Sequence, residues 1–190
     1  VDVQSVISRE KDPTEFGVVT IGAIHGGTAG NIIPDSVQLS GTIRSFKPEV
    51  RAKMHAGIER TAKAVAAMAG APPPDIKMLE GTKPVVNDPD LVAATAEALK
   101  ATFGDKFRTS PPGTASEDFS EYAGAGVPSM MFNIGVYDQE RIDAARNGGP
   151  PIPSNHSPQF APVPKPTIQT GVTAMTLAVL GAFDQYARGK

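Results

Sequence analysis

Two short segments of this chain carry the side chains best suited to chemistry. The first runs from Gly26 to Asp35, contains Asn31, and is followed by a strand-like stretch that ends near Arg44. The second is Asn155-His156-Ser157-Pro158. Neutral imidazole is a good ligand for zinc and similar divalent ions, and prolines on both sides of His156 restrict the backbone that carries it. We therefore consider His156 a candidate metal ligand, with a simple surface-loop histidine as the alternative.

Asn31 and Arg44 have side chains suited to holding a substrate. An arginine presents a planar fork that fits a carboxylate through two hydrogen bonds. An asparagine offers an amide donor that can polarise a carbonyl oxygen, as in an oxyanion hole. Two plainer interpretations stay open, because Asn31 can simply shape a turn and Arg44 can be a solvated residue on the polar face of its strand.

Two acidic residues lie side by side in the segment Thr114-Ala115-Ser116-Glu117-Asp118-Phe119. The spacing of Thr114 and Glu117 is that of a capping box, and Asp118 would favour a helix N-terminus electrostatically. We predict a short helix over residues 117–122 that begins with this cap. Such a role is compatible with a position beside an active site.

His25 lies between a strand-like stretch and the glycine-rich loop, in Ile24-His25-Gly26-Gly27. It is either a second imidazole near the substrate or a polar strand end. The loop resembles a phosphate loop but lacks the Gly-Lys-Ser/Thr ending and precedes a strand instead of a helix. Nucleotide binding is therefore not expected.

Composition limits the class of protein. The chain has 190 residues, 40% of them hydrophobic, a net charge of −2 and no cysteine. The charge gives no reason to expect nucleic acid or an anionic membrane as a partner, and the absence of cysteine removes disulfides and thiolate metal sites. The absence of cysteine also suits a cytoplasmic protein, which is what we expect. We expect no membrane partner, because the longest mainly apolar stretch, Gly171 to Phe183, is short for a bilayer.

The first eighty residues read as a small antiparallel sheet with helices on one face. A helix end over residues 1–10 precedes strands over 16–24 and 36–45, and the second strand alternates apolar and polar residues. Pro48 suits the first turn of a helix over 48–70. After three prolines, residues 76–79 have the pattern of an edge strand.

The remainder has the pattern of a mixed α/β unit. A helix over 89–103 is predicted with Asp88 as its cap, and the apolar run 129–134 is typical of a strand covered on both faces. Residues 138–164 are predicted to form a long loop. A last helix over 166–188 is expected to bury one stripe, which consists of Ile168, Val172, Met175, Val179 and Phe183.

Taken together, six stretches resemble the co-catalytic metallohydrolase family of aminoacylases, hippurate hydrolases and auxin-conjugate amidohydrolases. They are Ser8 to Pro13, Val19 to Gly22, Gly27 to Asp35, Gly41 to Arg44, Ser116 to Phe119, and Asn155 to Pro158. The resemblance implies an α/β fold with an α+β lid. Residues 1–78 would be most of a lid, or dimerisation, domain, and residues 79–190 the C-terminal part of a catalytic domain.

The resemblance also implies the site and the reaction. His156 matches the family's C-terminal metal ligand, Asn31 and Arg44 match substrate-binding lid residues, and Ser116 lies in a segment that lines the site. The implied reaction is hydrolysis of the amide bond of N-acyl or N-aminoacyl amino acids by two divalent metal ions, Zn, Mn, Co or Ni, and a glutamate base. The base and most of the ligands would precede Val1. The implied partner is a second copy of the chain, joined through the lid.

Two alternatives stay open at this point. A sister activity, such as a dipeptidase or a deacylase of amino-acid biosynthesis, would use the same residues. The chain could also be a protein of a different class, a lid-type dimerisation module without catalysis. Such a module would contain the segment from Gly26 to Asp35 but would need no metal centre.

Overall fold

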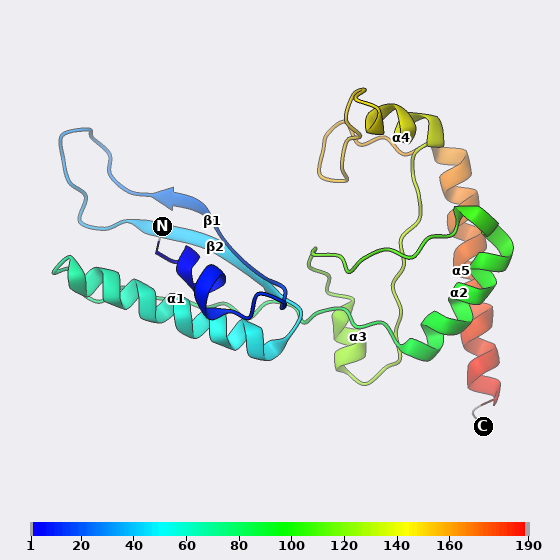
Figure 1. Ribbon diagram of the computed structural model, residues 1–190, viewed down its shortest axis with the longest axis horizontal. Helices are drawn as coiled ribbons and strands as arrows, with labels where there is room; N and C mark the ends of the chain where they lie inside the picture. Colours follow the sequence, from blue (N-terminus) through cyan, green and yellow to red (C-terminus); the bar gives the residue numbers. More distant parts are fainter. Residues whose placement is uncertain (1, 189–190) are drawn as a thin grey trace. The chain divides into compact units, whose positions relative to one another are not determined.

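The computed structural model describes residues 2–188, which form two compact units (Figure 1). One unit comprises the residues up to Pro84 together with Thr114–Asp118, and the other comprises Val85–Gly113 and the residues from Phe119 onward. The chain therefore passes between the units three times. The assignment of a lid to residues 1–78 and a catalytic part to 79–190 concerns the role of the units and stays a prediction.

A two-stranded antiparallel sheet forms the centre of the first unit. Strand β1 (Gly17–His25) pairs with β2 (Gln38–Ser45), with Gly17 opposite Ser45 and His25 opposite Gln38. The ladder is irregular between Ile21 and Ala23. β1 is rich in β-branched residues, which fit a pleated surface, and β2 alternates apolar and polar residues. For these reasons both strands could be predicted from the sequence. The α+β character expected for this part of the chain is confirmed.

The core of the first unit lies on one face of this sheet. The short helical turn η1 (Val6–Glu10) and the helix α1 (Pro48–Met68) lie along the hairpin (Figure 1). Val6, Val50 and Met54 are buried together, and Val19 and Ile43, which are opposite each other in the ladder, pack against them. The other face carries Val18, which is 37% exposed. Leu39 shares the face of Ile43 by strand alternation but lies near the loop end of the hairpin, where it is 58% exposed.

The prediction of an edge strand at residues 76–79 is wrong. Among the described residues the sheet has the strands β1 and β2 only, and the segment 76–79 has no regular structure. Pro72, Pro73 and Pro74 have no backbone N–H to donate, and Leu79 is 85% exposed. No strand of the described sheet lies beside this segment, so its β-like composition has no ladder partner.

Two packed helices organise the second unit. Helix α2 (Pro89–Phe103) lies along α5 (Pro164–Arg188), and Thr95, Leu99 and Ala174 are buried. The predicted cap of α2 is confirmed, because the Asp88 side chain accepts hydrogen bonds from the backbone N–H groups of Asp90 and Leu91. The shorter elements are η2 (Gly104–Lys106), α3 (Ser120–Gly124) and α4 (Gln139–Arg146).

Helix α5 does not bury the stripe predicted from its sequence. The five side chains of that stripe are between 42% and 66% exposed. The small residues pack instead: Ala174 is 2% exposed, and a Cβ added at Gly171 would lie 3.2 Å from Ile134 Cδ1. By length and composition, Pro164–Ala187 is also the one candidate for a membrane-crossing helix in the described chain, which is weak evidence because core helices of soluble proteins share this property.

Two further predictions for this unit are wrong. The segment 129–134 is not a strand, because it has no neighbouring strand among the described residues to complete a ladder. The expected long loop over 138–164 contains the helix α4. Asp138 occupies the N-cap position of α4, but its side chain makes no cap hydrogen bond. The stabilisation that an aspartate usually gives to a helix start is therefore absent at this position.

Candidate functional site

Arg44 lies one residue before the end of β2, at the end of the hairpin where α1 begins. It is opposite Val18 in the ladder and points to the face away from Ile43, so its half-buried side chain does not enter the core. Its guanidinium Nη1 donates to the backbone carbonyl oxygen of Thr114 at 2.6 Å. The same nitrogen lies 3.5 Å from the Ser116 hydroxyl oxygen. Arg44 is thus not a freely solvated residue of a polar strand face.

The predicted capping box at Thr114 is not formed. Helix α3 begins at Ser120 instead of Glu117, and its N-cap residue Phe119 makes no side-chain cap hydrogen bond. Thr114 and Ser116 belong to an irregular segment that is grouped with the first unit. The backbone carbonyl of Thr114 is used to hold Arg44, so this segment contributes to the surroundings of a candidate substrate residue.

Asn31 and His25 lie at the opposite end of the hairpin. Asn31 is exposed in the loop between the strands, in a turn closed by the Ile32 N–H bonding to the Ala29 carbonyl at 3.3 Å. His25 is exposed and pairs with Gln38, whereas Arg44 pairs near the other end of the ladder. Arg44 lies six positions after Gln38 along β2, a distance of about 20 Å at the usual rise of a strand. Figure 1 shows this loop at the end of the hairpin away from the start of α1.

The four predicted substrate residues therefore fall into two places. The structure brings Arg44 and Ser116 together and leaves Asn31 and His25 near the loop. A small substrate that contacts Arg44 does not reach the loop residues of the same chain.

His156 is exposed in a well-defined turn of the second unit. The Ser157 N–H bonds to the Ser154 carbonyl at 2.9 Å, and the Phe160 N–H bonds to the Ser157 carbonyl at 3.0 Å. The Tyr137 hydroxyl donates to the Pro153 carbonyl at 3.0 Å, and its ring meets Phe160 edge-on with centroids 5.9 Å apart. The turn around His156 is thus anchored on both sides, in line with the restricted backbone inferred from its prolines.

No group of three or more His, Asp or Glu side chains is arranged to hold a metal ion in the part of the chain that the structure describes. A catalytic zinc usually has three protein ligands. His156 fits the role of one ligand, but the described residues do not form a metal centre by themselves. The role of His156 as a ligand stays a prediction.

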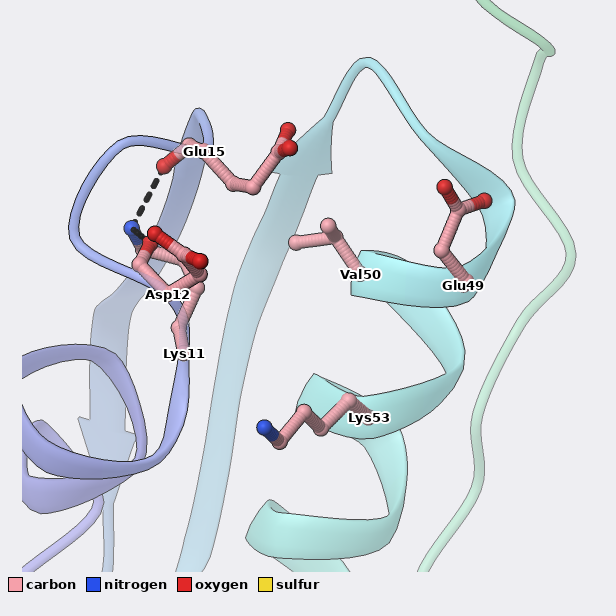
Figure 2. A pocket seen from close by; sticks show the side chains of 6 residues that line it. All are labelled: Lys11, Asp12, Glu15, Glu49, Val50 and Lys53. Atoms are coloured by element: carbon pink, nitrogen blue, oxygen red, sulfur yellow. Dashed lines mark hydrogen bonds between the residues drawn. The ribbon is translucent and has the colours of Figure 1, made fainter.

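A polar hollow lies elsewhere in the first unit, between the turn after η1 and the start of α1 (Figure 2). The Lys11 ammonium donates to the backbone carbonyls of Asp12 and Glu15, at 2.7 Å and 2.5 Å. The Glu15 carboxylate pairs with Lys47 at 2.6 Å, and this hydrogen bond raises the pKa of Lys47. The pKa of the Asp12 carboxyl is lowered mainly by the hydrogen bond from the Thr14 hydroxyl. These contacts tie the turn to the helix and give the hollow a structural role.

Sequence reasoning missed the partner that holds Arg44. A backbone carbonyl is present at every residue, so no residue type could have pointed to Thr114. The one available signal was Ser116, which the resemblance placed beside the site and which the structure places 3.5 Å from the guanidinium.

Comparison with known proteins supports a hydrolase relationship. Residues 8–148 match the family described as peptidase family M20/M25/M40. An N-acetyldiaminopimelate deacetylase of Leuconostoc mesenteroides is 34% identical over 145 residues, which cover 76% of this chain and 37% of that protein. An uncharacterized hydrolase of Sinorhizobium fredii is 36% identical over 135 residues, which cover 70% of this chain and 33% of the relative.

A solved structure has a similar fold. A protein from methicillin-resistant Staphylococcus aureus, described as a putative aminohydrolase, superposes with a TM-score of 0.66 at 25% sequence identity. The match covers 94% of this chain and 42% of the other. This chain therefore spans less than half the length of the relatives that it matches.

Proposed function

The chain belongs to the peptidase family M20/M25/M40, and from this premise we propose that it is part of a hydrolase that cleaves the amide bond of N-acyl amino acids. The observation that carries the proposal is the held guanidinium of Arg44 at the end of β2. An N-acyl amino acid retains a free carboxylate beside the amide bond. A guanidinium is the side chain best shaped to bind that group through two hydrogen bonds.

We favour a small acyl group. The relatives from Leuconostoc mesenteroides and Streptococcus thermophilus are both named N-acetyldiaminopimelate deacetylase. Their named substrate has an acetyl group on nitrogen and carboxylates on the same molecule. This combination favours a deacylase over a dipeptidase, and it suits a carboxylate-binding arginine.

Metal dependence is proposed only for the complete gene product. Within the described part of this chain the donors do not form a metal centre, so we assign no step of the reaction to a metal ion. His156 is proposed to supply one ligand. Metal analysis of the complete gene product with and without His156→Ala tests this, because loss of one ligand should lower the bound metal whatever the activity does.

Self-association through the first unit is also proposed. Apolar side chains near the loop end of its sheet, such as Leu39 and its partner Ile24, are exposed, and β1 and β2 each leave one edge unpaired in the described chain. Such edges and faces favour contact with another chain. Light scattering should give the mass of a dimer, and Leu39→Lys should shift it towards a monomer.

The decisive experiment for the proposed reaction replaces Arg44. In the complete gene product, Arg44→Ala should lower kcat/KM for N-acetyl amino acids by about 10- to 100-fold, the range expected for a lost hydrogen bond to a charged group. Arg60→Ala is the matched control, because Arg60 is another arginine of the first unit and its side chain bonds to a carboxylate, that of Glu10. Equal kinetics for wild type and Arg44→Ala would rule out the carboxylate clamp.

A further inference from the structure

The hydrogen bonds of Arg44 use only one side of its guanidinium. The group has five N–H donors: one on Nε and two on each Nη. Both contacts of Arg44 involve Nη1, which lies 2.6 Å from the Thr114 carbonyl oxygen and 3.5 Å from the Ser116 hydroxyl oxygen. Within the described chain, Nε and Nη2 have no protein acceptor at hydrogen-bond distance.

We propose that the segment 114–116 fixes the orientation of Arg44 through Nη1, so that the edge formed by Nε and Nη2 receives the substrate carboxylate. This inference rests on the proposed function of Arg44 and adds the side of the guanidinium that binds and the residues that orient it. Thr114 acts through its backbone carbonyl, and Ser116 acts as a positioning residue that does not touch the substrate.

The chemistry of the fork favours this arrangement. The Nε and Nη2 hydrogens are parallel and match the two oxygens of a carboxylate. A long side chain that is already held on its other side loses less conformational freedom when the ligand binds. The contact to the Thr114 carbonyl oxygen, at 2.6 Å, is much shorter than the 3.5 Å contact to the Ser116 hydroxyl, so it is the stronger of the two.

Replacing Arg44 with lysine tests whether both sides of the guanidinium are needed. The single ammonium of lysine cannot keep the Thr114 carbonyl and also offer a two-pronged edge to a carboxylate. Arg44→Lys should therefore weaken binding of N-acetyl-L-alanine about tenfold or more, the loss expected from one charge-assisted hydrogen bond. Ser116→Ala should weaken it only a few-fold, because the Thr114 carbonyl remains.

The experiment is side-chain NMR of arginine nitrogen in the present chain, with Arg44→Lys used to assign the Arg44 signals. Without ligand, Nη1 and Nη2 of Arg44 should give separate signals, because a fixed guanidinium does not rotate freely. The Ser116→Ala variant should bring these signals closer to averaging. On addition of N-acetyl-L-alanine, the Nε and Nη2 signals should move while Nη1 keeps its position. N-acetyl-L-alanine amide, which has no carboxylate, is the matched ligand control.

Each outcome has one meaning. Averaged Nη signals in the free protein, or movement of Nη1 and the Thr114 carbonyl carbon on ligand binding, would overturn the inference and leave the carboxylate clamp standing. Ligand binding with no carboxylate-dependent change at Arg44 would overturn both the clamp and the inference. Separate Nη signals together with selective movement of Nε and Nη2 would support both.

Discussion

The side chain of Asn87 bonds twice to the backbone of Met131. Its Nδ2 donates to the Met131 carbonyl oxygen at 2.9 Å, and its Oδ1 accepts the Met131 N–H, also at 2.9 Å. The next residue continues this contact, because the Asp88 N–H bonds to the Ser129 carbonyl at 2.8 Å. An amide side chain can offer one donor and one acceptor, which is what a neighbouring strand would offer at that position. Asn87 thus replaces part of a missing ladder for the segment 129–134.

Replacing Asn87 should loosen that segment. Asn87→Ala removes two hydrogen bonds and is expected to lower the free energy of unfolding of the second unit by about 1–3 kcal/mol. Amide hydrogen exchange at Met131 should become faster. Asn133→Ala is the control, since Asn133 is exposed in the same segment and makes no described hydrogen bond. Unchanged exchange at Met131 in Asn87→Ala would show that the pair does not hold the segment.

Two helical glycines should respond oppositely to alanine. A Cβ added at buried Gly57 in α1 would lie 2.7 Å from Val6 Cγ1, whereas a Cβ at Gly181 in α5 meets nothing within 4 Å. Gly57→Ala should destabilise by about 1–3 kcal/mol through overpacking, because Val6 is itself buried. Gly181→Ala should stabilise by roughly 0.5–1 kcal/mol through helix propensity. Denaturant unfolding of both variants checks the pair, and a gain in stability for Gly57→Ala would contradict the packing.

Met54 is the centre of the first core. It is 0% exposed on α1, whereas Met68, near the end of the same helix, is 82% exposed. Met54→Ala should destabilise the first unit by about 2–5 kcal/mol, and Met68→Ala should change stability by less than about 0.5 kcal/mol. Unfolding followed by circular dichroism would measure both. Similar losses for the two variants would show that the stability of α1 does not come from burial.

The helices and strands were predictable where local chemistry decides them. Asp88 followed by Pro89 fixed the start of α2, and the alternating residues before Arg44 indicated β2. These signals depend on neighbours in sequence. The segments 76–79 and 129–134 have equally strand-like composition, but a strand also needs a bonded neighbour, and the sequence of the segment does not contain that information.

Burial was harder to predict than helix position for the same reason. The helical spacing of apolar residues correctly indicated α5. The stripe that contains Val172 and Phe183 nevertheless stays exposed, whereas Ala174 is buried. Periodicity identifies which residues share a face. It does not say which face meets α2, because that depends on the shape of the partner.

The candidate site was predicted residue by residue but not as a geometry. Residue type made Arg44 a candidate carboxylate binder. The resemblance alone placed Ser116 in a segment that lines the site. The wide separation of Asn31 from Arg44 follows from the strand register, with Gln38 opposite His25. A register is set by cross-strand pairing, which the isolated loop sequence does not reveal.

His55 should make the first unit less stable in mild acid. Its half-buried position in α1 lowers its pKa from 6.5, because burial disfavours the charged ring and Arg51 adds repulsion. As the pH falls below about 6.5 the unfolded chain takes up this proton before the folded chain does, so stability decreases until the folded pKa is passed. Urea unfolding between pH 7.5 and pH 5, compared with His55→Gln, should show a smaller decrease in the variant. Arg51→Gln should raise the pKa of His55 in an NMR titration, and equal pH dependence in wild type and His55→Gln would contradict the assignment.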